Sequence, residues 1–290
     1  MPSLKHPHWL LLLQALLLVH NVSAGEADTD GFSLGPVTHI YSPYLADHKR
    51  VAFGLQFLSL SHTDIPDTGN ERLALRLGGR PELFRYQWQS APGATVQQLQ
   101  ANLEVGFRGH FDLTRSLDNI GWDGNYGLLF SYRGHPQRAY RFGVYHTSAH
   151  IGDEYAERVG RLRIEYTREE YLAGMQFNLT PRGQIYVEAG YAFNVDIKPL
   201  QQHKRLQAGL QYQQEGFSIS PRAGWFAAFD VNAYEERNWR PNRALSVGYS
   251  WRSAPHLWRL GLDYYSGQSQ LGEFFQHDEK YGGISLQLDI

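Results

Sequence analysis

Hydrophobic and polar residues alternate along most of the chain from about residue 50 to the end. In the stretches 99–107, 185–193, 206–212 and 284–290 every second residue is apolar, and most residues between them are polar or small. A period of two places successive side chains on opposite faces of an extended strand. The pattern therefore predicts an all-β protein whose strands have one apolar and one polar face.

The character of the polar face decides between a soluble β-sandwich and a membrane barrel. A sandwich would alternate as well, but here the polar face bears long charged side chains with Gly and Gln between them. Strands of about ten residues with an apolar outer face and a polar inner face are typical of transmembrane barrels, whose closure leaves no unpaired edge. The charged residues are Arg141, Arg163, Glu165, Glu188 and Arg259, and aromatic residues near strand ends are Trp225, Trp251, Trp258 and Tyr264.

Turn signals allow the strands to be counted. Short links with polar residues, Gly or Pro fall at 134–136, 180–183, 214–216 and 253–255, and longer links near 61–71, 111–123, 149–158, 195–203, 227–243 and 267–280. Outer-membrane barrels place short turns in the periplasm and long loops outside. We therefore expect a transmembrane antiparallel β-barrel of about 12 strands with both ends periplasmic.

This count depends on two segments each forming a single strand. In 159–179 the alternation shifts its phase near Arg168, Glu169 and Glu170, which we interpret as a β-bulge. In 72–88 the sequence Gly78-Gly79-Arg80-Pro81 interrupts the alternation. If either segment is a hairpin instead, the number of strands rises by two.

The first 24 residues predict export. A basic start at Lys5 is followed by a Leu-rich stretch and by small residues up to Ala24, the order found in a cleaved signal peptide. The alternative, a single spanning helix, would need about 20 apolar residues. Residues 25–49 alternate only weakly and are expected to be a periplasmic or lumen segment, and 50–290 the barrel. The expected location is the bacterial outer membrane.

Composition excludes several classes of protein. The 290 residues contain no Cys, so neither disulfides nor thiolate metal sites are available. A net charge of −2 gives no reason to expect nucleic acid as a partner. The last strand alternates up to Ile290 and resembles the signal recognised by the barrel-assembly machinery, although such signals usually end in an aromatic residue.

One stretch could carry chemistry. On the strand around 138–151, His146 and Ser148 lie two residues apart and therefore on the same face, with Cβ atoms about 7 Å apart. An imidazole at that spacing can reach a hydroxyl and act as its base. Ser148 would attack a lipid ester, His146 would accept the proton, and a third group would orient the imidazole.

The third group stays open at this point. Asp153, Glu154 and Glu157 in the following loop are the available carboxylates, and the first two are alternatively ligands for calcium, which prefers oxygen. A non-enzymatic interpretation is equally open, because polar residues are ordinary where strands meet lipid headgroups. The protein would then be a structural barrel or a narrow channel.

The same stretch carries a resemblance. His146-Thr147-Ser148-Ala149-His150-Ile151-Gly152-Asp153-Glu154 is similar to the box H-x-S-[SA]-H-[LI]-G-D-E of a bacterial outer-membrane protein family known only as a domain of unknown function. This resemblance implies a barrel and no established activity.

A second similarity concerns outer-membrane phospholipase A and the lipid A deacylase, which carry His-x-Ser on a lipid-facing strand. It implies outer-membrane lipids and lipopolysaccharide as partners, and Ser148 and His146 as the catalytic pair. The chain departs from these enzymes in two places. Ala149 and His150 replace the Asn-Gly that follows their Ser, and Gly160 stands where their third catalytic residue would be.

Overall fold

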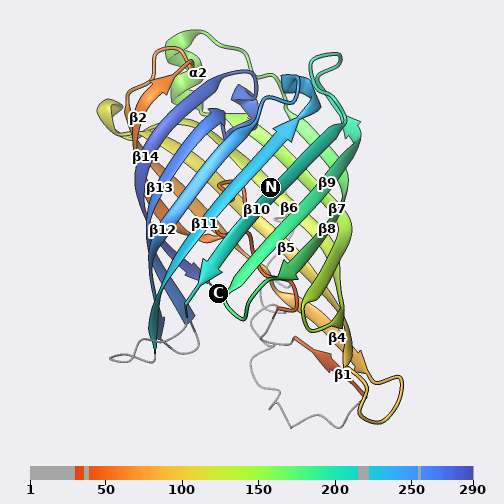
Figure 1. Cartoon of the computed structure of the whole chain (residues 1–290). Coiled ribbons are helices and arrows are strands. Elements are labelled where there is room, and N and C mark those ends of the chain that lie inside the picture. Colours follow the sequence, from red (N-terminus) through yellow and green to blue (C-terminus); the bar gives the residue numbers. More distant parts are fainter. Residues whose placement is uncertain (1–29, 36–38, 215–221, 254–255, 290) are drawn as a thin grey trace, which may run out of the picture.

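The computed structural model describes residues 30–35, 39–214, 222–253 and 256–289, and it shows long antiparallel strands wound into a barrel (Figure 1). The expected signal peptide at 1–24 and the last residue, Ile290, lie outside the described residues. The strands are β1 Gly31–Leu34, β2 Phe53–Thr63, β3 Glu71–Gly79, β4 Glu82–Trp88, β5 Gln97–Asp112, β6 Asp118–His135, β7 Arg138–Ile151, β8 Thr167–Asn178, β9 Gly183–Val195, β10 Lys204–Gln213, β11 Ala223–Tyr234, β12 Asn242–Ser253, β13 His256–Gln268 and β14 Asp278–Asp289.

The barrel closes because the first long strand pairs with the last. Each strand from β5 to β14 pairs antiparallel with the next, and β14 then pairs with β2. β3 and β4 both pair with β5, one after the other, so they form a single strand interrupted at Arg80 and Pro81. The closed barrel therefore has 12 strands, and both the count and the interrupted strand are confirmed.

Below the interruption the sheet leaves the barrel wall. β4 pairs with β1 rather than with β2, so β1, β4 and the first part of β5 extend beyond the lower end of the barrel, as Figure 1 shows. Pro81 fits this break because proline has no backbone N–H to donate to a ladder.

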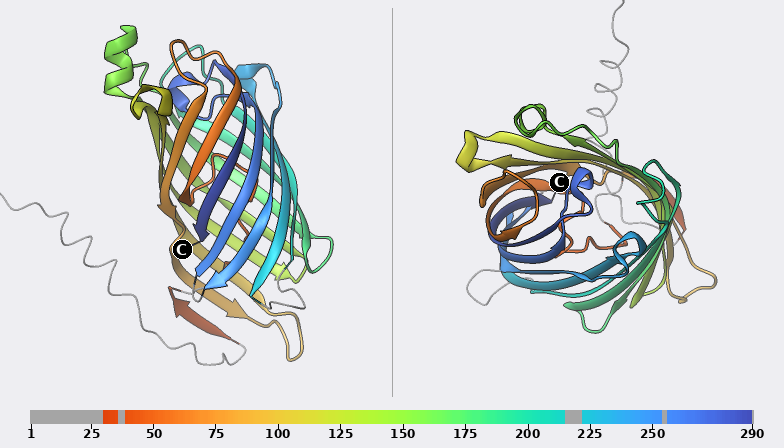
Figure 2. Two further views of the ribbon diagram at one scale, coloured as in Figure 1. Left: turned by 90° about the vertical axis from the view of Figure 1, so that its left-hand side faces the viewer. Right: turned by 90° about the horizontal axis from the view of Figure 1, so that it is seen from above.

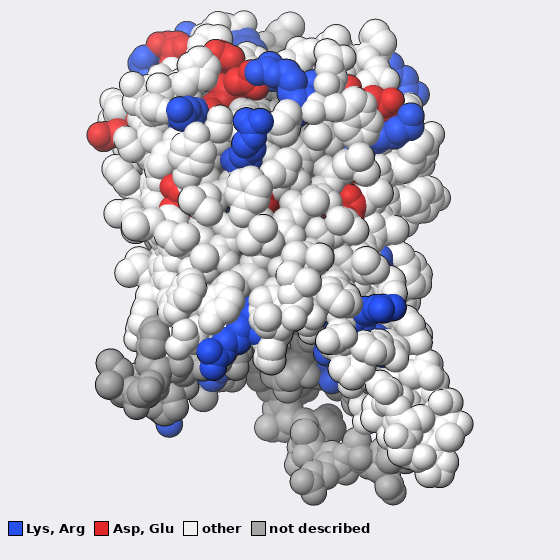
Figure 3. All heavy atoms as spheres, viewed as in Figure 1, with Lys and Arg blue, Asp and Glu red and all other residues white. Residues whose placement is uncertain are grey.

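The two faces of the strands lie as the alternation predicts. On β10, Leu206 and Leu210 face outward and are 55% and 53% exposed, whereas Gln207 between them is buried in the lumen. A space-filling view shows charged side chains gathered toward the two ends of the barrel with a largely uncharged band between them (Figure 3). An outward apolar band flanked by polar ends is the surface expected of a barrel surrounded by lipid.

The expected strand 159–179 is wrong in its first half. Residues 160–166 form a loop, and β8 begins at Thr167, which also puts Arg163 and Glu165 outside any strand. The apparent phase shift arises from joining this loop to the strand. A bulge does lie close by, since the register between β8 and β9 shifts between Glu169 and Glu170, with Phe193 of β9 as the extra residue.

Polar side chains fill the lumen together with a segment that precedes the barrel. Residues 39–52 run inside the barrel (Figure 2). Backbone N–H groups of this segment donate to side chains of the wall. Ile40 donates to Gln100 at 2.8 Å and Leu45 to Gln211 at 3.0 Å, and the Tyr44 ring stacks on Tyr186 with centroids 3.7 Å apart. Residues 39–52 are therefore part of the filling of the barrel.

The loops at the upper end contain little helix, and one of them, 152–166, joins β7 to β8. The helical elements are α2 Asp153–Val159 and the 3-10 helices η1 Leu113–Arg115, η2 Glu235–Arg237 and η3 Gly272–Phe274. Tyr155 of α2 packs on Phe274 of η3, so the loop after β7 is attached to the loop after β13. None of the helices in the described ranges is long and apolar enough to span a membrane.

Candidate functional site

The predicted pair lies on the outer surface of β7, near its upper end. Side chains alternate along this strand, and Thr147 points into the lumen, where it accepts a hydrogen bond from Asn125 of β6 at 2.8 Å. Its neighbours His146 and Ser148 therefore point outward, on the same side as the exposed Phe142 and Val144. The face expected from the sequence is the one observed.

His146 is held by a carboxylate from the next strand. Its Nδ1 lies 3.3 Å from Oε1 of Glu169, which is the residue directly opposite it on β8. On the other side, the imidazole stacks on Tyr126 of β6, with ring centroids 4.3 Å apart and planes at 20°. The carboxylate and the ring together fix the imidazole and leave its Nε2 as the nitrogen not engaged by Glu169.

Ser148 faces a gap in the neighbouring strand. It is paired with Gly124 of β6, and a Cβ built there would lie 3.6 Å from the Ser148 hydroxyl oxygen. Tyr126 and Trp122 flank Gly124 on the same outward face, and Trp122 stacks on His150 with centroids 4.0 Å apart. Between these two aromatic rings, Gly124 presents no side chain beside the Ser148 hydroxyl. Within the described part of the chain, the Ser148 side chain makes no hydrogen bond.

The loop carboxylates expected as the third group are placed elsewhere. Asp153 and Glu154 begin α2, and both are exposed. The carboxylate in contact with His146 is that of Glu169. The described residues contain no group of three or more His, Cys, Asp or Glu side chains arranged to hold a metal ion, so Asp153 and Glu154 have no such third ligand.

Glu169 stands out in the sequence only as part of the expected bulge. The signal that could have identified it is its parity, because it alternates with Glu170 at the start of β8 and so must face the side opposite to it. Its pairing with His146 depends on where β8 begins. The loop 160–166 obscures that start, because it continues the alternation by chance.

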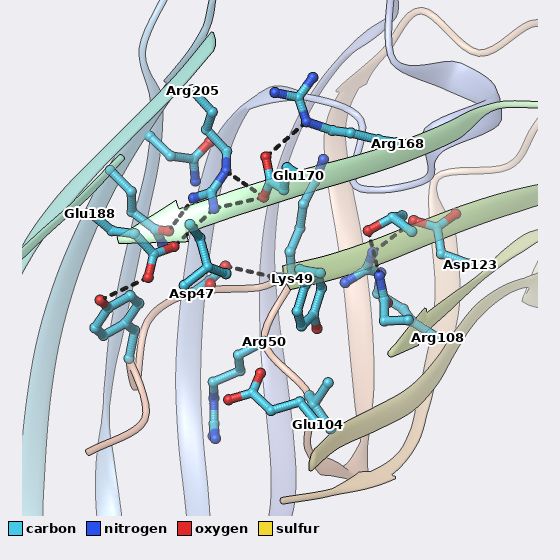
Figure 4. A pocket seen from close by; sticks show the side chains of 18 of the residues that line it. Asp47, Lys49, Arg50, Glu104, Arg108, Asp123, Arg168, Glu170, Glu188 and Arg205 are labelled. Carbon is cyan, nitrogen blue, oxygen red and sulfur yellow. Dashed lines mark hydrogen bonds and ion pairs between the residues drawn. The ribbon is translucent and has the colours of Figure 1, made fainter. Parts of the chain in front are cut away.

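The lumen holds a second concentration of polar groups, and charged side chains at its centre are paired with one another. Glu170 accepts from Arg168 at 3.0 Å and from Arg205 at 2.8 Å, and Arg108 pairs with Asp123 at 2.7 Å (Figure 4). The cavity among these side chains has a volume of about 90 Å³, which is room for a few water molecules. The lumen at this level is therefore a packed ionic network.

Comparison with known proteins supports the fold and assigns a family. The model of a family described as "Protein of unknown function (DUF1207)" matches residues 17–289. The chain belongs to the DUF1207 family. A search of curated proteins finds no significant match to this DUF1207 protein.

Solved structures similar to the DUF1207 protein are outer-membrane barrels. Outer membrane phospholipase A from Escherichia coli superposes with a TM-score of 0.55 at 11% identity, over 82% of this chain and 92% of that one. The calcium-bound dimer of the Salmonella typhi outer membrane phospholipase superposes with a TM-score of 0.53 at 11% identity, over 82% of this chain and 90% of that one. LpxR from Salmonella typhimurium superposes with a TM-score of 0.40 at 11% identity, over 82% of this chain and 99% of that one. This superposition is too loose for a comparison of sites. At these identities the likeness shows the fold alone: the chain is an outer-membrane-type β-barrel.

Proposed function

We propose that this protein resides in a bacterial outer membrane and hydrolyses acyl esters of membrane lipids, with Ser148 as nucleophile and His146 as its base. The observation that carries the proposal is the contact of Glu169 with Nδ1 of His146 beside Ser148, on the outer face of the barrel. A nucleophile, a base and a carboxylate that orients the base are the three members of a serine-hydrolase triad.

The chemistry follows from this order of groups. His146 Nε2 accepts the proton of the Ser148 hydroxyl while the hydroxyl oxygen bonds to the ester carbonyl carbon. The tetrahedral intermediate then breaks the bond to the alcohol oxygen, which leaves with the proton from His146. Water, activated by the same imidazole, releases the fatty acid and restores Ser148. Glu169 stabilises the positive charge that His146 carries between these steps.

The position of the pair supports a lipid as substrate. Below His146 on the same face lie the exposed Val144, Phe142 and Tyr140, along which an acyl chain can lie while its ester is at Ser148. A lipid can therefore reach the hydroxyl from the bilayer without entering the barrel. The ester carbonyl is placed over Gly124, which presents no side chain beside the Ser148 hydroxyl.

A narrow channel is the alternative that the sequence leaves open. In the described residues the lumen contains the segment 39–52 and a network of ion pairs, with a cavity of about 90 Å³ among them. No specific observation favours conduction.

The decisive experiment compares the protein with Ser148→Ala. Refolded protein is incubated with phospholipid and, separately, with lipopolysaccharide, each with and without calcium, and released fatty acid is measured. We expect the variant to lose activity on the accepted lipid by about 10³-fold or more, since the nucleophile is removed. Thr147→Ala is the matched control, because its neighbouring hydroxyl points into the lumen, and it should retain activity. Equal fatty-acid release by wild type and Ser148→Ala would refute the proposal.

The absence of a side chain at Gly124 gives a second prediction. Gly124→Leu should lower the hydrolysis rate by about 100-fold, because the added side chain fills the space in front of the Ser148 hydroxyl. Gly124→Ala should change it only slightly, since its Cβ would be in ordinary contact at 3.6 Å. Initial rates of hydrolysis of a micellar substrate are measured for both Gly124 variants and the wild type. Equal rates for Leu and Gly at this position would show that the substrate approaches from another direction.

A further inference from the structure

A row of basic side chains crosses the outer surface on the side of the barrel away from β7. Arg243 of β12 is opposite Ser266 of β13, Ser266 is opposite Lys280 of β14, and Lys280 is opposite His62 of β2. Neighbouring strands lie about 4.8 Å apart, so Arg243 and Lys280 flank the small Ser266 at a backbone separation of about 10 Å. Together with Arg240 these residues line a hollow of about 400 Å³.

The two central cations of this row are uncompensated. Among the described residues neither Arg243 nor Lys280 forms an ion pair, and Lys280 contacts only the Tyr264 ring, with its Nζ 6.0 Å from the centroid. Each carboxylate that lines the hollow is already part of an ion pair that does not include Arg243 or Lys280. Asp278 is paired with Arg237 and Arg240, and Glu279 with the buried Arg72. The hollow therefore has two positively charged groups, on Arg243 and Lys280, that can donate hydrogen bonds to a ligand.

The hollow lies immediately above the apolar band of the barrel. Directly below the row, the same strands present Leu245, Tyr264 and Leu262 outward, 42%, 40% and 60% exposed, as part of the apolar band. In Figure 3, Lys and Arg side chains lie immediately above the uncharged band. A ligand at this level would have its charged group beside Arg243 and Lys280 and its hydrocarbon against the strands below.

We infer that this hollow binds a phosphorylated lipid of the outer leaflet, with Arg243 and Lys280 contacting phosphate and the Ser266 hydroxyl between them. Lipopolysaccharide has the required chemistry, because its lipid A anchor carries phosphates and acyl chains on the same sugar headgroup. A phosphate accepts hydrogen bonds from guanidinium and ammonium groups, and these charge-assisted bonds are the strong ones. This inference depends on the proposed membrane location and not on the proposed hydrolysis, since the hollow and Ser148 lie on different strands.

The test titrates full-length protein in detergent micelles and measures bound lipid by native mass spectrometry. The probes are bis-phosphorylated lipid A, lipid A without phosphates, and inorganic phosphate. We expect bis-phosphorylated lipid A to bind, and the double variant Arg243→Ser, Lys280→Ser to bind it about 30-fold more weakly. Lipid A without phosphates should bind wild type and double variant equally weakly.

Two control variants show whether binding depends on this hollow. Arg252→Ser removes an exposed Arg near the opposite end of the same strand and should bind lipid A as wild type does. Ser148→Ala should also bind normally, so loss of hydrolysis and loss of this site are distinguishable. Unchanged affinity in the double variant would overturn the inference, as would displacement of lipid A by an equal concentration of inorganic phosphate.

Discussion

Glu170→Ala is expected to destabilise the barrel by about 3–5 kcal/mol, because it removes the carboxylate that two buried guanidinium groups share and leaves Arg205 with Glu188 and Arg168 with Glu236 alone. The Glu170 carboxylate accepts from Arg168 at 3.0 Å and from Arg205 at 2.8 Å, and all three side chains are buried in the lumen. Removing one partner of a buried ionic cluster costs more than the cluster contributes, since the remaining charges cannot regain water. Urea unfolding of the refolded protein in lipid vesicles measures the change.

The matched control for Glu170→Ala is Glu154→Ala, which removes an exposed carboxylate at the start of α2. It should change the unfolding free energy by no more than about 0.5 kcal/mol. An unchanged unfolding midpoint for Glu170→Ala would contradict this expectation and show that Glu188 and Glu236 suffice to compensate Arg205 and Arg168.

Replacing Glu169, the neighbour of Glu170, is expected to affect activity and not stability. Glu169→Gln should lower kcat for lipid hydrolysis by about 10²–10⁴-fold with little change in stability, because an amide cannot stabilise the positive charge on His146. Glu169 is on the outer face, with its side chain 35% exposed, and its contact with His146 is the only one that the described residues show for it. Steady-state kinetics and urea unfolding on the same preparations separate the two effects.

Glu169→Asp provides a rescue test for this positioning role. It keeps the charge on a shorter side chain and should recover part of kcat, whereas a purely structural role would not distinguish Asp from Gln in this way. If Glu169→Gln retains full kcat while Ser148→Ala is inactive, the carboxylate that orients His146 lies elsewhere, and Asp153 and Glu154 become the residues to replace.

Much of this architecture could be predicted from the sequence, because a barrel wall is built from local alternation. Which side of β10 faces outward follows from Leu206 and Leu210 alternating with Gln207, and the outward direction of His146 and Ser148 follows from the same rule applied to β7. The count of 12 strands follows from loop lengths once the interruption at Pro81 is accepted. Each of these features depends on residues close together in the chain.

The features that could not be predicted depend on residues far apart. The contact of His146 with Glu169 requires the register between β7 and β8, and the loop 160–166 hides that register by alternating without being a strand. The course of residues 39–52 inside the barrel is fixed by bonds to Gln100, Gln176 and Gln211, which only a closed wall brings together. The local sequence of residues 39–52 shows no pattern from which hydrogen-bond partners so far away in the chain could be predicted.

The segment in the lumen also bears on how the molecule is put together. It precedes every strand of the wall, yet His48 contacts Tyr281 of the final strand, and Arg50 contacts Gln287 there. These two contacts of the segment can form only when β14 is in place. Pairing of β14 with β2 therefore both closes the wall and completes the set of partners of residues 39–52.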